Sequence, residues 1–399
     1  MQLFAAISAA LALFSAVSAA PTVQLTTVET YAGSVKPSSY IVKLKDGVSK
    51  DAHLAWLAEN HGATATVTHA DWAPDVVNGF AGECTFDSDA LNALRASPDV
   101  DSIAEDGVVT IVATQTNATW GLQRISQAAE LTNQNTSDLT FTYTYDDSAG
   151  EGVDIYVVDT GIFTNHSEFG GRATWGATFG GYPDADGNGH GTHVSGTAAG
   201  ATYGVAKKAN LFAVKVLSDA GTGFISDIVS ALSWVSQQVT ASGRPSIATM
   251  SLSGSASQTF DDAVASLTAQ GIHVTVAAGN NDADAGLFSP GRAPSAITVG
   301  ASTIADARAS FSNFGSIVDI FAPGQDVISA WIGGVNNTNN ISGTSMATPH
   351  VAGLVATIIS RDGNTSPADI STKIQTLSTN GTLTSIPSGT VNDLARNES

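Results

Sequence analysis

Residues 152–161, GVDIYVVDTG, form an apolar, β-branched run that ends in an acid, Asp159. A short run that is apolar at every position predicts a strand buried on both faces of a parallel sheet. Segments with helical spacing, 224–243 and 259–271, lie between later apolar runs, and each ends in glycine. This alternation predicts an α/β layered domain that starts at about Ala113. The further apolar runs span residues 210–217, 246–254, 271–280 and 296–302.

The chain before that domain has a different pattern. Residues 39–48 alternate like a strand, and residues 49–62 have helical spacing that ends at Gly62. Two further strand-like pieces, 76–86 and 101–112, enclose a helical segment at 88–97. This order predicts a small α+β unit.

The first twenty residues, MQLFAAISAALALFSAVSAA, are apolar and end in small side chains. They predict a secretory signal peptide, with a buried N-terminal helix as the alternative. No later apolar run is long enough to cross a bilayer, so no membrane attachment is expected. Cys84 is the only cysteine, which excludes an intramolecular disulfide. N-x-[ST] sequons agree with a secreted glycoprotein and begin at Asn117, Asn135, Asn165, Asn336, Asn340, Asn364, Asn380 and Asn397.

The net charge of −20 is spread along the chain rather than gathered in blocks. A solvated surface explains it simply. Because no basic cluster is present to neutralise phosphates, the composition argues against nucleic-acid binding.

Three residues from distant parts of the α/β domain carry groups suited to acyl transfer. Asp159 ends a buried strand, where it is either a turn cap or an orienting acid. His190 lies between two glycines in DADGNGHGTHVSG, which leaves its ring accessible. Ser345 lies among small residues at the start of a helix, in NISGTSMATPHVAG. A serine needs a base, and the base needs an acid, so the order Asp, His, Ser predicts a catalytic triad.

Acyl transfer also requires hydrogen-bond donors for the oxyanion. Asn280 follows the apolar run 271–280 after a small-residue turn. Its side-chain amide is one candidate donor, and the backbone N–H of Ser345 is the other. The simpler interpretation of Asn280 is a turn residue.

Together these motifs resemble the subtilisin-like serine proteases (peptidase S8), most closely the proteinase K branch of secreted fungal enzymes. VVDTGI, DGNGHGTHVSGT, AAGNN and SGTSMATPHVAG occur in the family's order, around Asp159, His190, Asn280 and Ser345. The resemblance implies a three-layer fold with a mostly parallel central sheet flanked by helices. It further implies a secreted, monomeric endopeptidase that cleaves proteins and peptides with broad specificity.

The same resemblance divides the chain into three parts. Residues 1–20 would be the signal peptide and 113–399 the catalytic domain. Residues 21–112, folded over about 39–112, would be an inhibitor I9-type propeptide. The family's propeptide acts as an intramolecular chaperone and inhibitor and is removed autocatalytically.

Substrate and metal sites are also implied by the resemblance. Substrate would pair with two extended segments, and a pocket with small apolar walls would favour large apolar or aromatic residues before the scissile bond. One structural calcium is implied, while a second site lacks its aspartate because Thr382 stands there. The implied substrate residues are Gly221, Thr222, Gly223, Ser251, Leu252, Ser253, Gly254, Ala277, Ala278 and Gly279. The implied calcium ligands are Asp319 and the carbonyls of Pro294 and Ala296.

Other functions fit the motifs less well. An α/β-hydrolase would need a G-x-S-x-G elbow, whereas Ser345 lies in G-T-S-M-A. A dinucleotide-binding domain would need G-x-G-x-x-G after its first strand. Residues 184–189 imitate an EF-hand loop, but Ser195 replaces the final glutamate. A catalytically silent binding protein with the same fold remains the alternative, although the nucleophile and the oxyanion donor are both retained.

Overall fold

The computed structural model describes residues 25–31, 35–62, 66–83, 88–107 and 112–397. The chain forms two compact units that divide between Val109 and Thr110, and each unit is described by itself. The predicted signal peptide, residues 1–20, and Cys84 lie outside the described residues.

The N-terminal unit is a four-stranded sheet with the order β1-β4-β2-β3 and two helices. Its strands are β1 (Val28–Glu29), β2 (Val35–Leu44), β3 (Gly79–Glu83) and β4 (Val100–Gly107). Its helices are α1 (Lys50–His61) and α2 (Ser88–Ala96). Helix α1 begins at Ser49, whose side chain accepts the N–H of Ala52. Strand pairing begins at Val28, before the start of folding expected at Ser39, because β1 adds to β4 in parallel.

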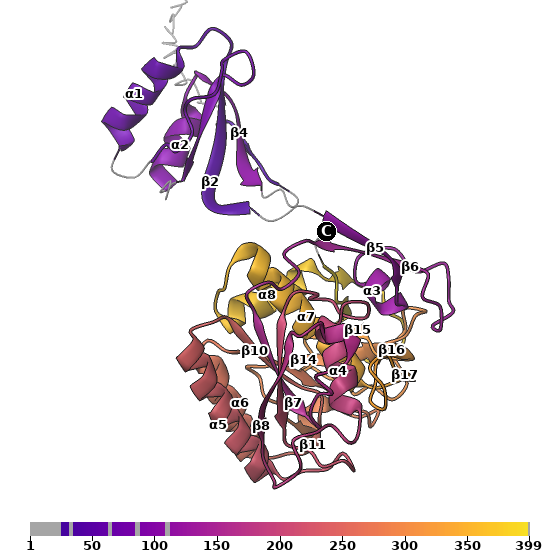
Figure 1. The fold of residues 1–399 in the computed structure, drawn as a ribbon. Helices are drawn as coiled ribbons and strands as arrows, with labels where there is room; N and C mark the ends of the chain where they lie inside the picture. Colours follow the sequence, from indigo (N-terminus) through magenta and orange to yellow (C-terminus); the bar gives the residue numbers. More distant parts are fainter. Residues whose placement is uncertain (1–24, 32–34, 63–65, 84–87, 108–111, 398–399) are drawn as a thin grey trace, which may run out of the picture. The chain divides into compact units, whose positions relative to one another are not determined.

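The C-terminal unit is built on a nine-stranded sheet with the order β18-β19-β15-β14-β12-β10-β7-β9-β8. Figure 1 shows this unit, with helices beside the sheet. Every pair in this sheet is parallel except β18 with β19, so the predicted fold class is confirmed. The predicted apolar runs form β7 (Asp154–Asp159), β9 (Asn210–Lys215), β10 (Ser246–Met250), β12 (His273–Ala277) and β14 (Ile297–Ser302). The sequence did not predict β8 (Ala173–Thr178), β15 (Ile320–Pro323), β18 (Thr379–Asn380) and β19 (Asp393–Leu394).

Helices cover both faces of this sheet. Alternate residues of β7 therefore pack into different cores: Ile155 and Val157 contact the core that contains α4 and α7, whereas Tyr156 and Val158 contact α5 and α6. Both sides need apolar residues, which explains why the strand sequence is continuous rather than alternating. The covering helices are α4 (His190–Ala199), α7 (Thr344–Asp362), α5 (Ile225–Ser242) and α6 (Gln258–Ala269).

Local signals in the sequence set the helix ends. Helix α5 ends at Gly243, which has a φ of 63°, and α6 begins after Ser257, whose side chain accepts the N–H of Phe260. The remaining elements are short helices and two-stranded sheets around the large sheet. They are α3 (Trp120–Arg124), α8 (Pro367–Leu377), the 3₁₀ turns Ser167–Phe169 and Ala285–Leu287, β5 (Val112–Ala118), β6 (Phe141–Asp146), β11 (Gly254–Ser255), β13 (Phe288–Ser289), β16 (Val327–Ala330) and β17 (Thr338–Ile341). Among the described residues, no helix combines the length and apolar character that a membrane span needs.

Candidate active site

Asp159 is the last residue of β7, and its side chain is fully buried. Its Oδ1 accepts the backbone N–H of Thr160 at 2.7 Å. In parallel sheets the carboxyl ends of strands face loops and helix starts, which is where ligand chemistry gathers. The strand thus delivers a buried carboxylate to the functional edge of the sheet.

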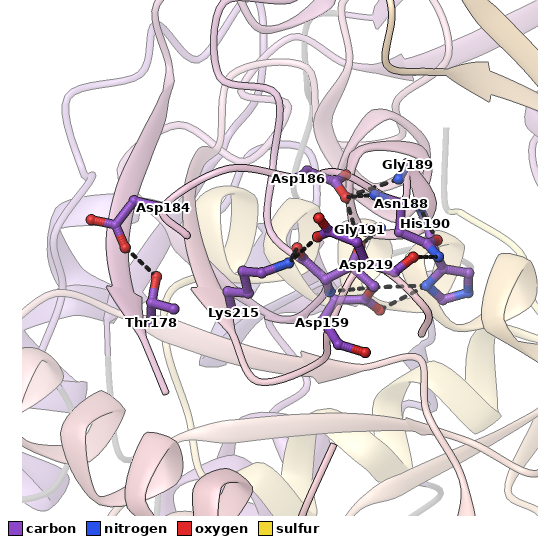
Figure 2. Close-up of polar contacts among 12 residues, drawn as sticks. Asp159, Thr178, Asp184, Asp186, Asn188, Gly189, His190, Gly191, Lys215 and Asp219 are labelled. Atoms are coloured by element: carbon purple, nitrogen blue, oxygen red, sulfur yellow. Dashed lines mark hydrogen bonds and ion pairs between the residues drawn. The ribbon is translucent and has the colours of Figure 1, made fainter. Parts of the chain in front are cut away.

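His190 is the first residue of α4 and points its ring at that carboxylate (Figure 2). Its Nδ1 lies 2.8 Å from Oδ1 and 3.0 Å from Oδ2 of Asp159. Because a carboxylate only accepts hydrogen bonds, Nδ1 carries the proton and Nε2 is left as an acceptor. The His190 side chain is 25% exposed, so the ring keeps contact with the cleft.

The glycines on either side of His190 serve packing as well as access. Gly189 has a φ of 100°, and a Cβ there would lie 2.6 Å from the Trp331 indole. A Cβ on Gly191 would lie 2.1 Å from the carbonyl oxygen of Gly161. Only glycine fits either position, and the helix start is held tightly against its neighbours.

Asp186 holds the start of α4 and acts on the pKa of His190. Its buried carboxylate accepts the N–H groups of Gly189 at 2.8 Å and Thr192 at 3.0 Å. Burial lowers the pKa of His190, but the charge and hydrogen bond of Asp159, with the charge of Asp186, outweigh it and raise that pKa. The sequence analysis considered this acid only within an EF-hand-like loop, so its capping role was missed.

Ser345 is the second residue of α7 and lines the same cleft as His190. Its hydroxyl donates to the carbonyl of Ser251 at 3.0 Å. Although both side chains are described, no hydrogen bond joins the His190 ring to Ser345. The contact between His190 and Asp159 is therefore formed in this structure, whereas the Ser345 hydroxyl is hydrogen-bonded to Ser251.

Pro349 lies inside α7, where proline would ordinarily break a helix. An N–H at that position would donate to the carbonyl of Ser345, four residues earlier. Proline leaves this carbonyl free, and the hydroxyl of Ser251 donates to it at 2.8 Å. The proline thus makes room for a bond that fixes the backbone of Ser345 to Ser251, the residue that follows β10.

The amide of Asn280 is oriented by Thr344. Its Oδ1 accepts both the backbone N–H of Thr344 at 2.8 Å and the Thr344 hydroxyl at 2.9 Å. The Nδ2 group of Asn280 therefore points away from Thr344, and a Cβ built on Gly343 would lie 3.5 Å from Nδ2. The sequence analysis did not single out Thr344, whose partner lies far away along the chain.

The cleft has a volume of about 630 Å³, and His190 is the only ionisable side chain among its lining residues. Of the implied substrate residues, eight line it: Gly221, Thr222, Gly223, Ser251, Leu252, Ser253, Gly254 and Ala277. Ala278 and Gly279 do not. Ala278 is fully buried in a separate apolar cluster, and a Cβ on Gly279 would meet the Asn313 amide at 2.4 Å.

Asn313 organises the loop that follows β12. Its Nδ2 donates to the carbonyl of Ala278 at 2.8 Å, and its Oδ1 accepts the N–H groups of Asn281 and Ala283. The side chain is fully buried, so these bonds replace water for the loop backbone. Nothing in the sequence around Asn313 indicated this role.

Asp319 lies beside the segment that carries the other implied calcium ligands. It accepts the backbone N–H of Thr298, two residues after Ala296, at 2.8 Å and the Gln375 amide at 3.2 Å. Burial raises the pKa of Asp319 to about 6. No basic side chain in the described part of the chain forms an ion pair with it. Pro294 and Ala296 line a hollow of about 460 Å³.

A carboxylate that is largely buried without a basic partner fits a bound cation. Calcium takes carboxylate and carbonyl oxygens, and both kinds are present here. Within the described ranges, no three His, Cys, Asp or Glu side chains gather as a metal site. The residues therefore fit a site made of one carboxylate, backbone carbonyls and water.

Comparison with known proteins identifies the family of this chain. The pattern of the Subtilase family (peptidase S8) matches residues 150–392, which include Asp159, His190, Asn280 and Ser345. The chain belongs to the subtilase family. A second pattern, peptidase inhibitor I9, matches residues 39–112, so this subtilase carries an I9 domain before its catalytic unit.

Relatives of this subtilase include a cuticle-degrading protease of Metarhizium anisopliae. It is 46% identical, with 92% of this chain and 91% of the relative covered. Proteinase R of Parengyodontium album is 45% identical, with 92% and 90% covered. The crystal structure of a cold adapted subtilisin-like serine proteinase is 41% identical with a TM-score of 0.64, covering 71% of this chain and 99% of that one. The protein is a subtilisin-like serine endopeptidase of the fungal, proteinase K-like group.

Proposed function

We propose that Ser345, His190 and Asp159 form the catalytic triad of this subtilase. The hydroxyl oxygen of Ser345 attacks the scissile carbonyl, while Nε2 of His190 takes its proton. The amide C–N bond then breaks, and His190 returns the proton to the leaving amine. Water repeats the sequence on the acyl-enzyme and frees Ser345. The contact between His190 Nδ1 and Asp159 carries this proposal, since it leaves the base correctly protonated.

The proposed oxyanion donors are Nδ2 of Asn280 and the backbone N–H of Ser345. Both lie at the helix start, where the dipole of α7 favours negative charge. The Thr344 bonds to Oδ1 support this role, because they leave Nδ2 as the group that faces the cleft.

The pH dependence of kcat/KM tests the assigned base. His190 acts only when neutral, and its pKa is raised, so activity should rise through an apparent pKa above 6.5. Below that point kcat/KM should fall about tenfold per pH unit. Asp159→Asn removes the charge that raises this pKa and should lower kcat by about 10⁴. A wild-type profile that is flat between pH 5 and 8 would contradict the assignment.

The cleft supports a preference for apolar substrates. An extended peptide would pair with residues 221–223 on one side and 251–254 on the other. Ala277 forms a small apolar wall, and no acidic side chain lines the cleft to receive a basic residue. In a peptide series varied at the residue before the scissile bond, phenylalanine should exceed lysine in kcat/KM by at least about tenfold. Equal rates for the two would refute this specificity.

We also propose secretion and self-processing. Residues 1–20 would direct export, residues 21–112 would assist folding and inhibit the enzyme, and the mature chain would begin at Ala113. The I9 match and the division of the chain between Val109 and Thr110 support this order.

A calcium held by Asp319 and the carbonyls of Pro294 and Ala296 would stabilise the fold without entering the reaction. At a concentration about 100 times the Kd it contributes about 2.7 kcal/mol. A chelator should therefore lower Tm by about 5–10 °C. Asp319→Asn should lose most of this response, and a chelator that leaves the wild-type Tm unchanged would refute the site. Because Thr382 supplies no carboxylate, we propose no second site.

A further inference from the structure

Lys215 is a charged residue that the proposed reaction does not use, yet it lies beside the catalytic acid. It is the last residue of β9 and pairs in register with Asp159 on β7. Its side chain is fully buried. The Nζ group donates to the carbonyl of Thr160 at 2.6 Å and to Oδ1 of Asp219 at 3.0 Å, and it lies 5.6 Å from the Tyr182 ring.

Asp219 connects this lysine to the substrate side of the cleft. It lies in a tight turn in which Ser218 and Thr222 are hydrogen-bonded through their backbones at 2.8 Å. The turn leads directly into Gly221, Thr222 and Gly223, which line the cleft. Asp219 therefore lies where the substrate-binding segment begins.

Asp219 also touches the loop that leads into His190 (Figure 2). The Asn188 amide donates to the carbonyl of Asp219 at 2.9 Å. A Cβ on Gly187 would lie 2.2 Å from Asp219 Oδ2, so glycine alone allows this approach. The hydrogen bond from Lys215 lowers the pKa of Asp219, which keeps the carboxylate charged.

Thr160 completes the connection on the catalytic side. It directly follows Asp159, and its hydroxyl donates to Oδ1 of Asp186 at 2.9 Å while accepting the N–H of Gly191 at 2.9 Å. Lys215 thus binds the backbone carbonyl of Thr160, and the Thr160 hydroxyl bonds to residues on both sides of His190, Asp186 and Gly191. The ammonium group of Lys215 therefore contacts three segments of the chain, those that carry Thr160, Asp219 and Tyr182.

Burying a lysine is unfavourable unless its charge is paired and hydrogen-bonded, and an apolar residue would often stabilise a core as well. We propose that Lys215 and Asp219 are positioning residues that couple the substrate-binding turn to the Asp159–His190 pair. This inference rests on the proposed function, because it assumes that residues 221–223 bind the peptide. Substrate that pairs with these residues orders the turn, and Lys215 transmits that order to the backbone beside Asp159.

Two substrates separate this role from a purely structural one. A tetrapeptide amide reaches residues 221–223, whereas a single-residue ester reaches only the catalytic groups and the pocket at Ala277. Asp219→Ala should lower kcat/KM for the tetrapeptide about tenfold, chiefly through KM, and for the ester less than twofold. Asp219→Asn should lie between, because its amide oxygen still accepts from Lys215.

Lys215→Met should lower kcat for both substrates, since it also removes the donor to Thr160. The concentration of active sites is titrated with phenylmethylsulfonyl fluoride, and rates are expressed per active site. A variant that yields less folded enzyme therefore does not give a lower rate for that reason alone. If Lys215→Met gives no folded protein, the Asp219 variants still test the proposal, because Asp219 is exposed. Asp147→Ala removes an exposed carboxylate that forms an ion pair with another lysine, Lys208; this variant is the control and should leave both rates unchanged.

For Asp219→Ala, equal losses on the two substrates, or rates within twofold of wild type on both, would overturn the coupling. A wild-type enzyme that hydrolyses neither substrate would instead refute the proposed function. The two failures are therefore distinguishable.

Discussion

Ser345→Ala is expected to abolish measurable peptide hydrolysis while leaving the fold intact. Removing the nucleophilic serine of subtilisin lowers kcat by about 10⁶, and the same order is expected here. The substitution removes one hydrogen bond, from the Ser345 hydroxyl to the carbonyl of Ser251. The reciprocal bond from Ser251 to the Ser345 carbonyl remains, and alanine is a good helix former. The variant should therefore keep the wild-type circular dichroism spectrum.

The same variant tests self-processing. Wild-type protein should begin at Ala113 by N-terminal sequencing, whereas Ser345→Ala should retain the preceding domain. Ser342→Ala provides a matched control, since Ser342 is exposed and contacts Asp326 rather than the cleft. Hydrolysis that persists in Ser345→Ala, or processing at Ala113 in an expression host without other proteases, would contradict the assigned nucleophile.

Asn280→Ala is expected to lower kcat by about 10²–10³ with little change in KM. This is the loss found when the corresponding type of donor is removed from subtilisin. The donor acts on charge that develops only in the transition state, so ground-state binding is largely unaffected. Steady-state kinetics on a peptide amide separates the two parameters.

Thr344→Val refines the same test. It keeps the Asn280 side chain but removes one of the two hydrogen bonds that orient it. A smaller loss in kcat, about tenfold, is expected because the backbone N–H of Thr344 still holds Oδ1. If Asn280→Ala raised KM and left kcat unchanged, Asn280 would be a substrate-binding residue rather than an oxyanion donor.

The sequence predicted those parts of the fold whose signal is local and repeated. Residues 155–158 of β7 are apolar at every position because successive side chains, such as Ile155 and Tyr156, enter different cores, so the pattern indicates a strand covered on both faces. The end of α5 at Gly243 could also be predicted, because glycine commonly ends helices. Strands such as β18 and β19, of two residues each, leave no comparable pattern and were missed.

The candidate site divides in the same way. Asp159, His190 and Ser345 carry chemistry that the sequence alone suggests, and the structure brings all three to one edge of the sheet. Thr344, Asn313 and Lys215 are single polar residues whose roles depend on partners far along the chain, so no local pattern marks them.

For two motifs, the sequence analysis explained only some of the residues or only one of their roles. The glycines around His190 were expected to expose the ring, but they also admit Trp331 and the Gly161 carbonyl. The motif around Ser345 was recognised for its serine and small residues, whereas the missing N–H of Pro349 within it leaves the Ser345 carbonyl free for Ser251. Both reasons concern atoms brought close by the fold, which sequence spacing does not reveal.

Covalent labelling with phenylmethylsulfonyl fluoride tests the triad most directly. Mature wild-type enzyme, analysed by mass spectrometry of its peptides, should carry one sulfonyl group, on the peptide that contains Ser345. Labelling should accelerate with the same apparent pKa as hydrolysis and should fall by orders of magnitude in His190→Ala. A label on any other residue, or equal labelling of wild type and His190→Ala, would show that His190 does not activate Ser345.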